Sequence, residues 1–119
     1  MKLITREIET TLRRNAARQL QSGEGDHAPA LKLFNPCGAA TWLITELDED
    51  GIMFGLCDLG LGCPELGYIS LAELEAVKGP MGIGIERDLH FTASGPISAY
   101  AEAARDAGQI VETLDQVTA

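Results

Sequence analysis

Cysteine is scarce in this chain, and its spacing fits no metal-binding or redox motif. The 119 residues contain only Cys37, Cys57 and Cys63. An odd number without a Cys-x-x-Cys pair argues against a disulfide framework and against a zinc ribbon. Adding His27 and His90 produces no zinc signature either. The sequence therefore predicts reduced, mostly buried thiols, with no metal and no cofactor.

Long apolar runs are also missing, although 45% of the residues are hydrophobic. No run approaches the roughly 20 residues that cross a bilayer. Charged residues interrupt the N-terminal segment where a signal peptide would have its apolar core. The length fits a single domain over residues 1–119 with one core. We expect a cytoplasmic protein.

Positive charge is scarce outside the first twenty residues. The net charge is −9; residues 1–20 carry +3, so the rest of the chain carries −12. Such an acidic body repels a phosphate backbone, which disfavours direct nucleic-acid binding. Phe34 and Trp42 lack the interleaved basic residues of a base-stacking surface, so they are expected in the core.

Apolar spacing predicts a helix followed by three strands. The helix covers residues 5–20, with Thr5 as its N-cap. Strands are predicted at 30–35, 40–47 and 52–59, and the acidic "DEDG" between the last two indicates a hairpin. The predicted apolar stripe of the helix consists of Ile8, Leu12, Ala16 and Leu20.

A tight register of this hairpin sorts its side chains onto two faces that are both largely apolar. The first face would carry Leu43, Thr45, Leu47, Ile52, Phe54 and Leu56. The second would carry Trp42, Ile44, Glu46, Met53, Gly55 and Cys57. This pattern predicts a sheet covered on both sides, or covered on one side and paired with another chain on the other.

Residues 65–88, "ELGYISLAELEAVKGPMGIGIERD", contain signals for the start and the end of a helix. After a short strand, Ser70 and Glu73 form a capping box. The helix would cover residues 71–78 and end with Gly79 as a left-handed C-cap, because the following proline cannot continue it.

The glycine-rich loop after this helix does not have the pattern of a phosphate-binding loop. It follows a helix C-terminus, whereas a phosphate needs a helix N-terminus behind it. It is predicted to connect to a strand at 89–93. A C-terminal helical segment, 94–119, has Pro96 in its first turn. Gly108 either ends that helix or lies inside a longer one, and we favour the first.

One group of titratable side chains is a candidate site. In an extended segment, Glu86, Asp88 and His90 share one face, and two carboxylates with an imidazole are typical of a metal or acid–base site. The alternative, which we favour, is an arginine–carboxylate network around Arg87 that fastens the loop to the sheet. The full candidate cluster, functional or structural, comprises Glu65, Tyr68, Glu86, Arg87, Asp88 and His90.

Several motifs together resemble a known family. They are "LITREI" at 3–8, "KLFNP" at 32–36, "TWLITELD" at 41–48, "FGLCDLG" at 54–60, "ELGYISLAELE" at 65–75 and "GIGIERDLHF" at 82–91. In combination they resemble the bacterial domain-of-unknown-function family numbered twenty-nine fifty-eight. The resemblance covers residues 1–93, and most departure is expected after Gly95. It implies a small cytoplasmic protein of plasmids and conjugative elements, and it brings no reaction, cofactor or catalytic residue.

The elements together predict an α+β fold, a mainly antiparallel sheet of four or five strands with helices packed on it. The expected function is a non-enzymatic protein-binding or accessory module of a mobile element, with another protein as partner. One alternative is an acidic DNA mimic of the anti-restriction type. The other is a small enzyme or metal site that uses Glu86, Asp88 and His90 in a pocket. The DNA mimic requires one acidic stripe of Asp48, Glu49, Asp50, Asp58 and Glu65.

Overall fold

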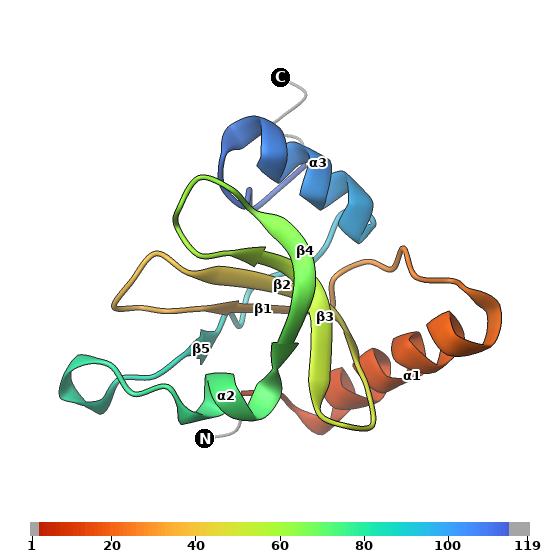
Figure 1. Ribbon diagram of the computed structural model, residues 1–119, viewed down its shortest axis with the longest axis horizontal. Helices are drawn as coiled ribbons and strands as arrows, with labels where there is room; N and C mark the ends of the chain where they lie inside the picture. The colour runs from red at the N-terminus through yellow and green to blue at the C-terminus, as the bar shows by residue number, and fades with distance from the viewer. Residues whose placement is uncertain (1–2, 115–119) are drawn as a thin grey trace.

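A computed structural model describes residues 3–114, and within them the chain forms a five-stranded antiparallel sheet with three α-helices (Figure 1). The elements in chain order are α1 (Arg6–Ser22), β1 (Leu31–Phe34), β2 (Thr41–Leu47), β3 (Ile52–Asp58), β4 (Glu65–Ser70), α2 (Leu71–Ala76), the short 3-10 helix η1 (Pro80–Gly82), β5 (Glu86–Arg87) and α3 (Ile97–Ala107). The strand order is β4-β3-β2-β1-β5. The predicted α+β class is confirmed.

Both faces of the sheet are covered, as the two apolar faces of the hairpin predicted. In Figure 1, α3 lies above the strands and α1 lies below them and to the right. The larger core lies between the sheet, the N-terminal segment, α1 and α2, and includes Leu12, Leu33, Trp42, Ile44, Met53 and Leu74. The second core joins Leu43 and Leu56 of the sheet to Ile97, Tyr100, Ala101 and Ala104 of α3.

A β-bulge in β2 changes which side chains occupy each face. The pairing of β2 with β3 shifts at Thr45, after which Glu46 lies opposite Phe54 and Leu47 lies opposite Met53. The extra residue reverses the alternation beyond it. The predicted faces of Glu46 and Leu47 were therefore wrong, and Leu47 joins the α1 core. Glu46 lies on the α3 side, where partial burial raises the pKa of its carboxyl group.

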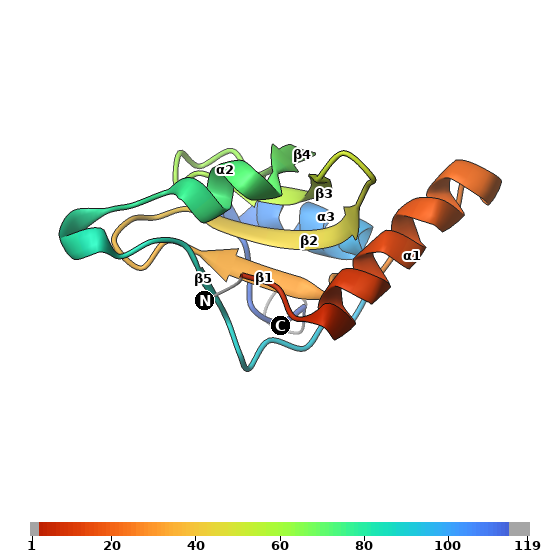
Figure 2. The same cartoon turned by 90° about the horizontal axis from the view of Figure 1, so that it is seen from below.

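Helix α1 begins as predicted, but its last turns extend past the sheet. The amide of Ile8 donates to Oγ1 of Thr5 at 3.1 Å, which confirms the N-cap. From the middle of the helix, Nδ2 of buried Asn15 donates to the carbonyl oxygen of Thr45 at 2.9 Å and supports the bulge. Leu20 is 84% exposed, so its assignment to the apolar stripe was wrong. Figures 1 and 2 show this end of α1 projecting from the strands.

Helix α2 is shorter than predicted, and a projecting loop follows it. Ser70 caps the amide of Glu73 at 3.2 Å, but the helix ends at Ala76. Gly79 has a φ of −88°, so the predicted left-handed C-cap was wrong. The amide of Gly79 instead donates to the carbonyl oxygen of Ile83 at 2.7 Å and closes the loop. We call residues 77–84 the finger; it projects at the left of Figures 1 and 2.

The predicted strand at 89–93 does not form, and β5 contains only Glu86 and Arg87. The reason is local: Oδ1 of Asp88 accepts the amide hydrogen of His90 at 2.9 Å. An aspartate that bonds the backbone two residues onward makes a turn. The chain therefore turns just after β5 and does not continue along β1.

The C-terminal helix ends where its sequence signal indicated, but Pro96, which was predicted in the first turn, lies just before the helix as its N-cap. Gly108, with a φ of 76°, forms a left-handed C-cap and ends the helix. The loop before β1 supplies an additional cap, because Asp26 accepts bonds from the amide and hydroxyl of Ser98. These bonds lower the pKa of Asp26. Of the predicted segment 94–119, residues 115–119 lie outside the described part.

Candidate functional site

The candidate cluster predicted from the sequence is divided between two edges of the sheet. Glu65 and Tyr68 lie on β4, whereas Glu86 and Arg87 form β5, and these strands are at opposite edges. Asp88 follows β5 directly. The structure therefore keeps the Glu86–Asp88 segment together and places Glu65 and Tyr68 elsewhere.

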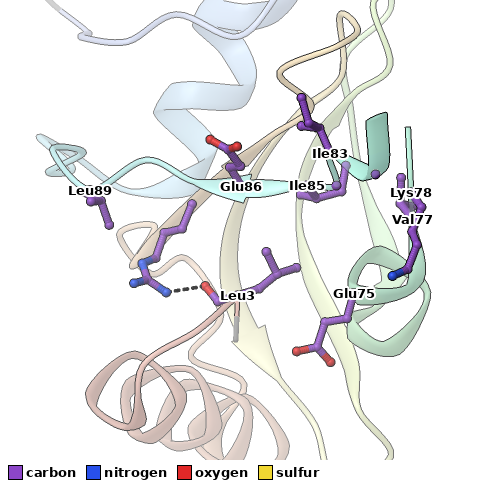
Figure 3. Close-up of a pocket in the computed structure, with 11 residues that line it drawn as sticks. Leu3, Glu75, Val77, Lys78, Ile83, Ile85, Glu86 and Leu89 are labelled. Atoms are coloured by element: carbon purple, nitrogen blue, oxygen red, sulfur yellow. Dashed lines mark hydrogen bonds between the residues drawn. The ribbon is translucent and has the colours of Figure 1, made fainter. Parts of the chain in front are cut away.

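Arg87 joins β5 to the N-terminal segment. Its Nη1 donates to the carbonyl oxygen of Leu3 at 2.6 Å, which links residues 84 positions apart in the sequence. The dashed line in Figure 3 marks this bond. The guanidinium is partly buried at this position. Because a charged donor forms a strong bond to a backbone acceptor, Arg87 fastens the N-terminal segment to the sheet edge.

Asp88 belongs to a charged cluster around Lys32 that the sequence did not reveal. Nζ of Lys32 lies 3.4 Å from Oδ2 of Asp88 and 3.2 Å from Oε1 of Glu112, and the lysine side chain is only 10% exposed. The bond from the amide of His90 lowers the pKa of Asp88, and Lys32 lowers it further. The available sequence signal was a single lysine inside the apolar strand β1.

Replacing Asp88 with asparagine should lower the unfolding free energy at pH 7 by about 1 kcal/mol. The reason is that buried Lys32 loses the less exposed of its two carboxylate partners. The folded pKa of Asp88 is depressed, so its contribution is present above the unfolded pKa of about 4 and disappears as the pH falls through the folded pKa. Urea unfolding at pH 7 and in acid measures this difference. Glu86→Gln is the control, because Glu86 is exposed, and this variant should leave the unfolding free energy almost unchanged. A difference that persists unchanged in acid would contradict the ion pair.

A groove of about 630 Å³ lies beside the finger and β5. In Figure 3, Leu3 lies below Ile85, with Val77 and Lys78 on the right and Leu89 on the left. The side chains around the groove are Leu3, Glu75, Val77, Lys78, Ile83, Ile85, Glu86, Arg87 and Leu89, together with Gly82 and Gly84. The groove thus combines apolar walls with two acidic and two basic side chains.

Apolar side chains around this groove are unusually exposed. Met81, at the tip of the finger, is 97% exposed, Leu89 is 71% exposed, and Val77 and Ile83 are each more than one third exposed. Exposed apolar side chains beside a concavity are typical of a docking site. The sequence pattern predicted only a connector for this stretch. The overlooked signal was the apolar residues that alternate with its glycines.

The acidic residues proposed for a DNA mimic do not form one exposed stripe. Residues 48–50 lie in the turn at one end of β3, and Asp58 lies at the other end. Asp58 is buried; its carboxylate accepts from the amide of Gly60 at 2.9 Å and from that of Ile110 at 3.0 Å. This carboxylate fastens the C-terminal segment to the sheet.

The cysteines are free thiols, as predicted, but the prediction that most are buried was wrong. Cys37 and Cys63 are exposed and Cys57 is half-buried. Burial raises the pKa of the Cys57 thiol. Between residues 3 and 114, no group of three or more His, Cys, Asp or Glu side chains is arranged to hold a metal ion. No helix in this range has the length and apolarity needed to span a membrane.

Comparison with known proteins identifies a family without adding a reaction. Neither the curated proteins nor the solved structures contain a significant match to this chain. A family model described as "Protein of unknown function (DUF2958)" matches residues 3–111. The match includes every element from α1 to α3, and so extends past residue 93. Because it covers nearly the whole chain, the protein belongs to this DUF2958 family.

Proposed function

We propose that this protein is a protein-binding module and that the finger and its groove are the docking surface. The observation that carries the proposal is Met81, whose side chain is 97% exposed at the tip of the closed loop. Its φ of 59° is unusual for a residue other than glycine. Backbone strain of this kind persists where the surrounding structure holds it, and it is concentrated at functional sites.

The shape of the surface favours a macromolecular partner. A small molecule in the groove would leave the tip of the finger in water, whereas a protein surface can cover both. The acidic net charge of −9 disfavours nucleic acid and an anionic membrane. The charged groups at the groove are balanced in sign. We therefore expect a protein partner that inserts an apolar side chain between acidic and basic groups.

The resemblance to a family of plasmids and conjugative elements supports an accessory role in such an element. It indicates which partners to test first, namely the proteins encoded beside this one. The tagged full-length protein would be used to capture the partner from the native host, and mass spectrometry would identify it. The purified partner would then be titrated by calorimetry.

Replacing Met81 with asparagine should weaken binding of the purified partner about tenfold or more, because burying an apolar side chain of this size contributes about 1.5–3 kcal/mol. Asparagine tolerates the left-handed backbone, so the loop keeps its conformation. Leu20→Asn is the matched control, since Leu20 is 84% exposed on the projecting end of α1. If the partner binds Met81→Asn as tightly as the unmodified protein, the finger is not the docking surface.

A further inference from the structure

Strand β4 is an edge strand without the usual protection. Within residues 3–114 it pairs with β3 alone, through six consecutive residue pairs without a shift in register. Edge strands normally carry lysine, proline or a bulge that prevents pairing with another chain. The sequence of β4, "ELGYIS", contains neither lysine nor proline. Its outer edge is therefore a regular template for another strand.

The side chains of β4 make this edge apolar on the α3 side of the sheet. Leu66 lies opposite Leu56, which belongs to the α3 core, and Tyr68 lies opposite Phe54. Leu66 is 44% exposed and Tyr68 is 75% exposed. The rings of Tyr68 and Phe54 are 5.1 Å apart between centroids. Covering these side chains would remove apolar surface from water, which favours association.

Gly67, at the middle of β4, has no explanation within the chain. A Cβ atom on Gly67 would meet nothing within 4 Å, and its φ lies outside the left-handed range that favours glycine. Glycine inside a strand costs about 0.5–1 kcal/mol relative to alanine. Glycine inside a strand often marks a bulge, a bend, or a place where a ligand or another backbone approaches closely, and the unshifted pairing of β4 with β3 leaves no bulge here. This observation is independent of the exposed side chains.

We propose that a second copy of this chain pairs antiparallel with β4 about a two-fold axis at Gly67, which joins the two sheets. The strand is self-complementary about this residue: Leu66 of one copy lies opposite Tyr68 of the other, and Glu65 lies opposite Ile69. Apolar pairs across strands are favourable, and no like charges face each other. A foreign strand would not require this symmetry, so the sequence favours a second copy. The proposal does not depend on the finger.

The assembly has a distinctive salt dependence. Each copy carries a net charge of −9, so the copies repel each other. Salt screens that repulsion and leaves apolar contacts and backbone pairing in place. Dimerisation should therefore strengthen as the salt concentration rises. Binding of a basic foreign peptide to this acidic chain would weaken instead.

Sedimentation and light scattering over a range of protein concentrations test the proposal. The full-length chain should reach twice its mass of 12.7 kDa, and Tyr68→Lys should remain at the single-chain mass with at least a tenfold weaker dissociation constant. Leu61→Lys is the matched control, since Leu61 is 80% exposed in the loop before β4. Circular dichroism and urea unfolding verify that both variants fold.

A pair of cysteines placed on either side of the axis tests the register. In a chain with Cys37→Ser, Cys57→Ala and Cys63→Ser, oxidation of an equal mixture should cross-link Glu65→Cys to Ile69→Cys, which the proposed register places opposite each other, and leave Leu61→Cys as single chains. Three results would overturn the proposal: a single-chain mass at every concentration, a dimer that persists in Tyr68→Lys, or cross-linking at position 61 without cross-linking between positions 65 and 69. A monomer that binds only a foreign strand at this edge would overturn it as well.

Discussion

Replacing Tyr100 with alanine is expected to lower the free energy of unfolding by about 3–5 kcal/mol, the range for truncating a buried aromatic side chain. Tyr100 is 1% exposed and packs in the core that joins α3 to Leu43 and Leu56 of the sheet. Its ring also lies 6.3 Å from that of Phe91 between centroids. The truncation leaves a cavity where α3 meets β3. Chemical unfolding followed by circular dichroism measures the loss.

Tyr100→Phe separates packing from the hydroxyl group. The Tyr100 hydroxyl oxygen accepts the amide hydrogen of Ser94 at 2.9 Å. Because Ser94 is exposed, water can replace that acceptor, and the phenylalanine variant should lose only about 1 kcal/mol. If the alanine variant is no less stable than the phenylalanine variant, α3 does not form a core with the sheet.

The elements that the sequence predicted well depend on local signals. Thr5 caps α1, Ser70 caps α2, and Gly108 ends α3, each through contacts within a few residues of the chain. The β2–β3 hairpin also follows from two apolar runs with a short acidic turn between them. Such features are visible in a sequence because neighbouring residues supply every group involved.

The features that the sequence did not reveal depend on distant contacts. Register at the Thr45 bulge is supported by Asn15, which is 30 positions earlier in the chain. Leu20 fits the apolar period of α1, but the sheet ends before reaching it, and periodicity carries no information on the width of a sheet. The predicted strand at 89–93 does not form for a different reason. The bond from the amide of His90 to Asp88 competes with strand pairing.

The candidate site was predicted only in part, for the same reason. The sequence identified Glu86, Arg87 and Asp88 as a unit, and the structure keeps them adjacent. It could not show that Lys32 is the partner of Asp88, nor that Leu3 forms part of the groove. These contacts arise when β5 pairs with β1 and the N-terminal segment crosses that edge. A charge in an apolar strand indicates that a partner is needed, and only the topology identifies it.

Replacing Gly55 with alanine should lower the unfolding free energy by about 3 kcal/mol, because the new methyl group has no space. A Cβ atom on Gly55 would collide with the carbonyl oxygen of Leu43 and lie 2.8 Å from Cα of Ile44. These are backbone atoms of the adjacent β2, so no side chain can rotate to make room. The measurement is urea unfolding, which should also show whether the β2–β3 pairing weakens.

Gly67→Ala is the matched control, because Gly67 lies directly opposite Gly55 in β4 and its Cβ position is open. Both substitutions should be made in the Tyr68→Lys background, so that association at the β4 edge does not contribute to the measured stability. Gly67→Ala should then be neutral or stabilising by up to about 1 kcal/mol, since alanine restricts the unfolded chain more than glycine does. If both variants lost the same amount of unfolding free energy, the clash with β2 would not be the reason for glycine at position 55. A large loss at position 55 alone assigns Gly55 to the interior of the sheet and leaves Gly67 to be explained by what approaches its outer edge.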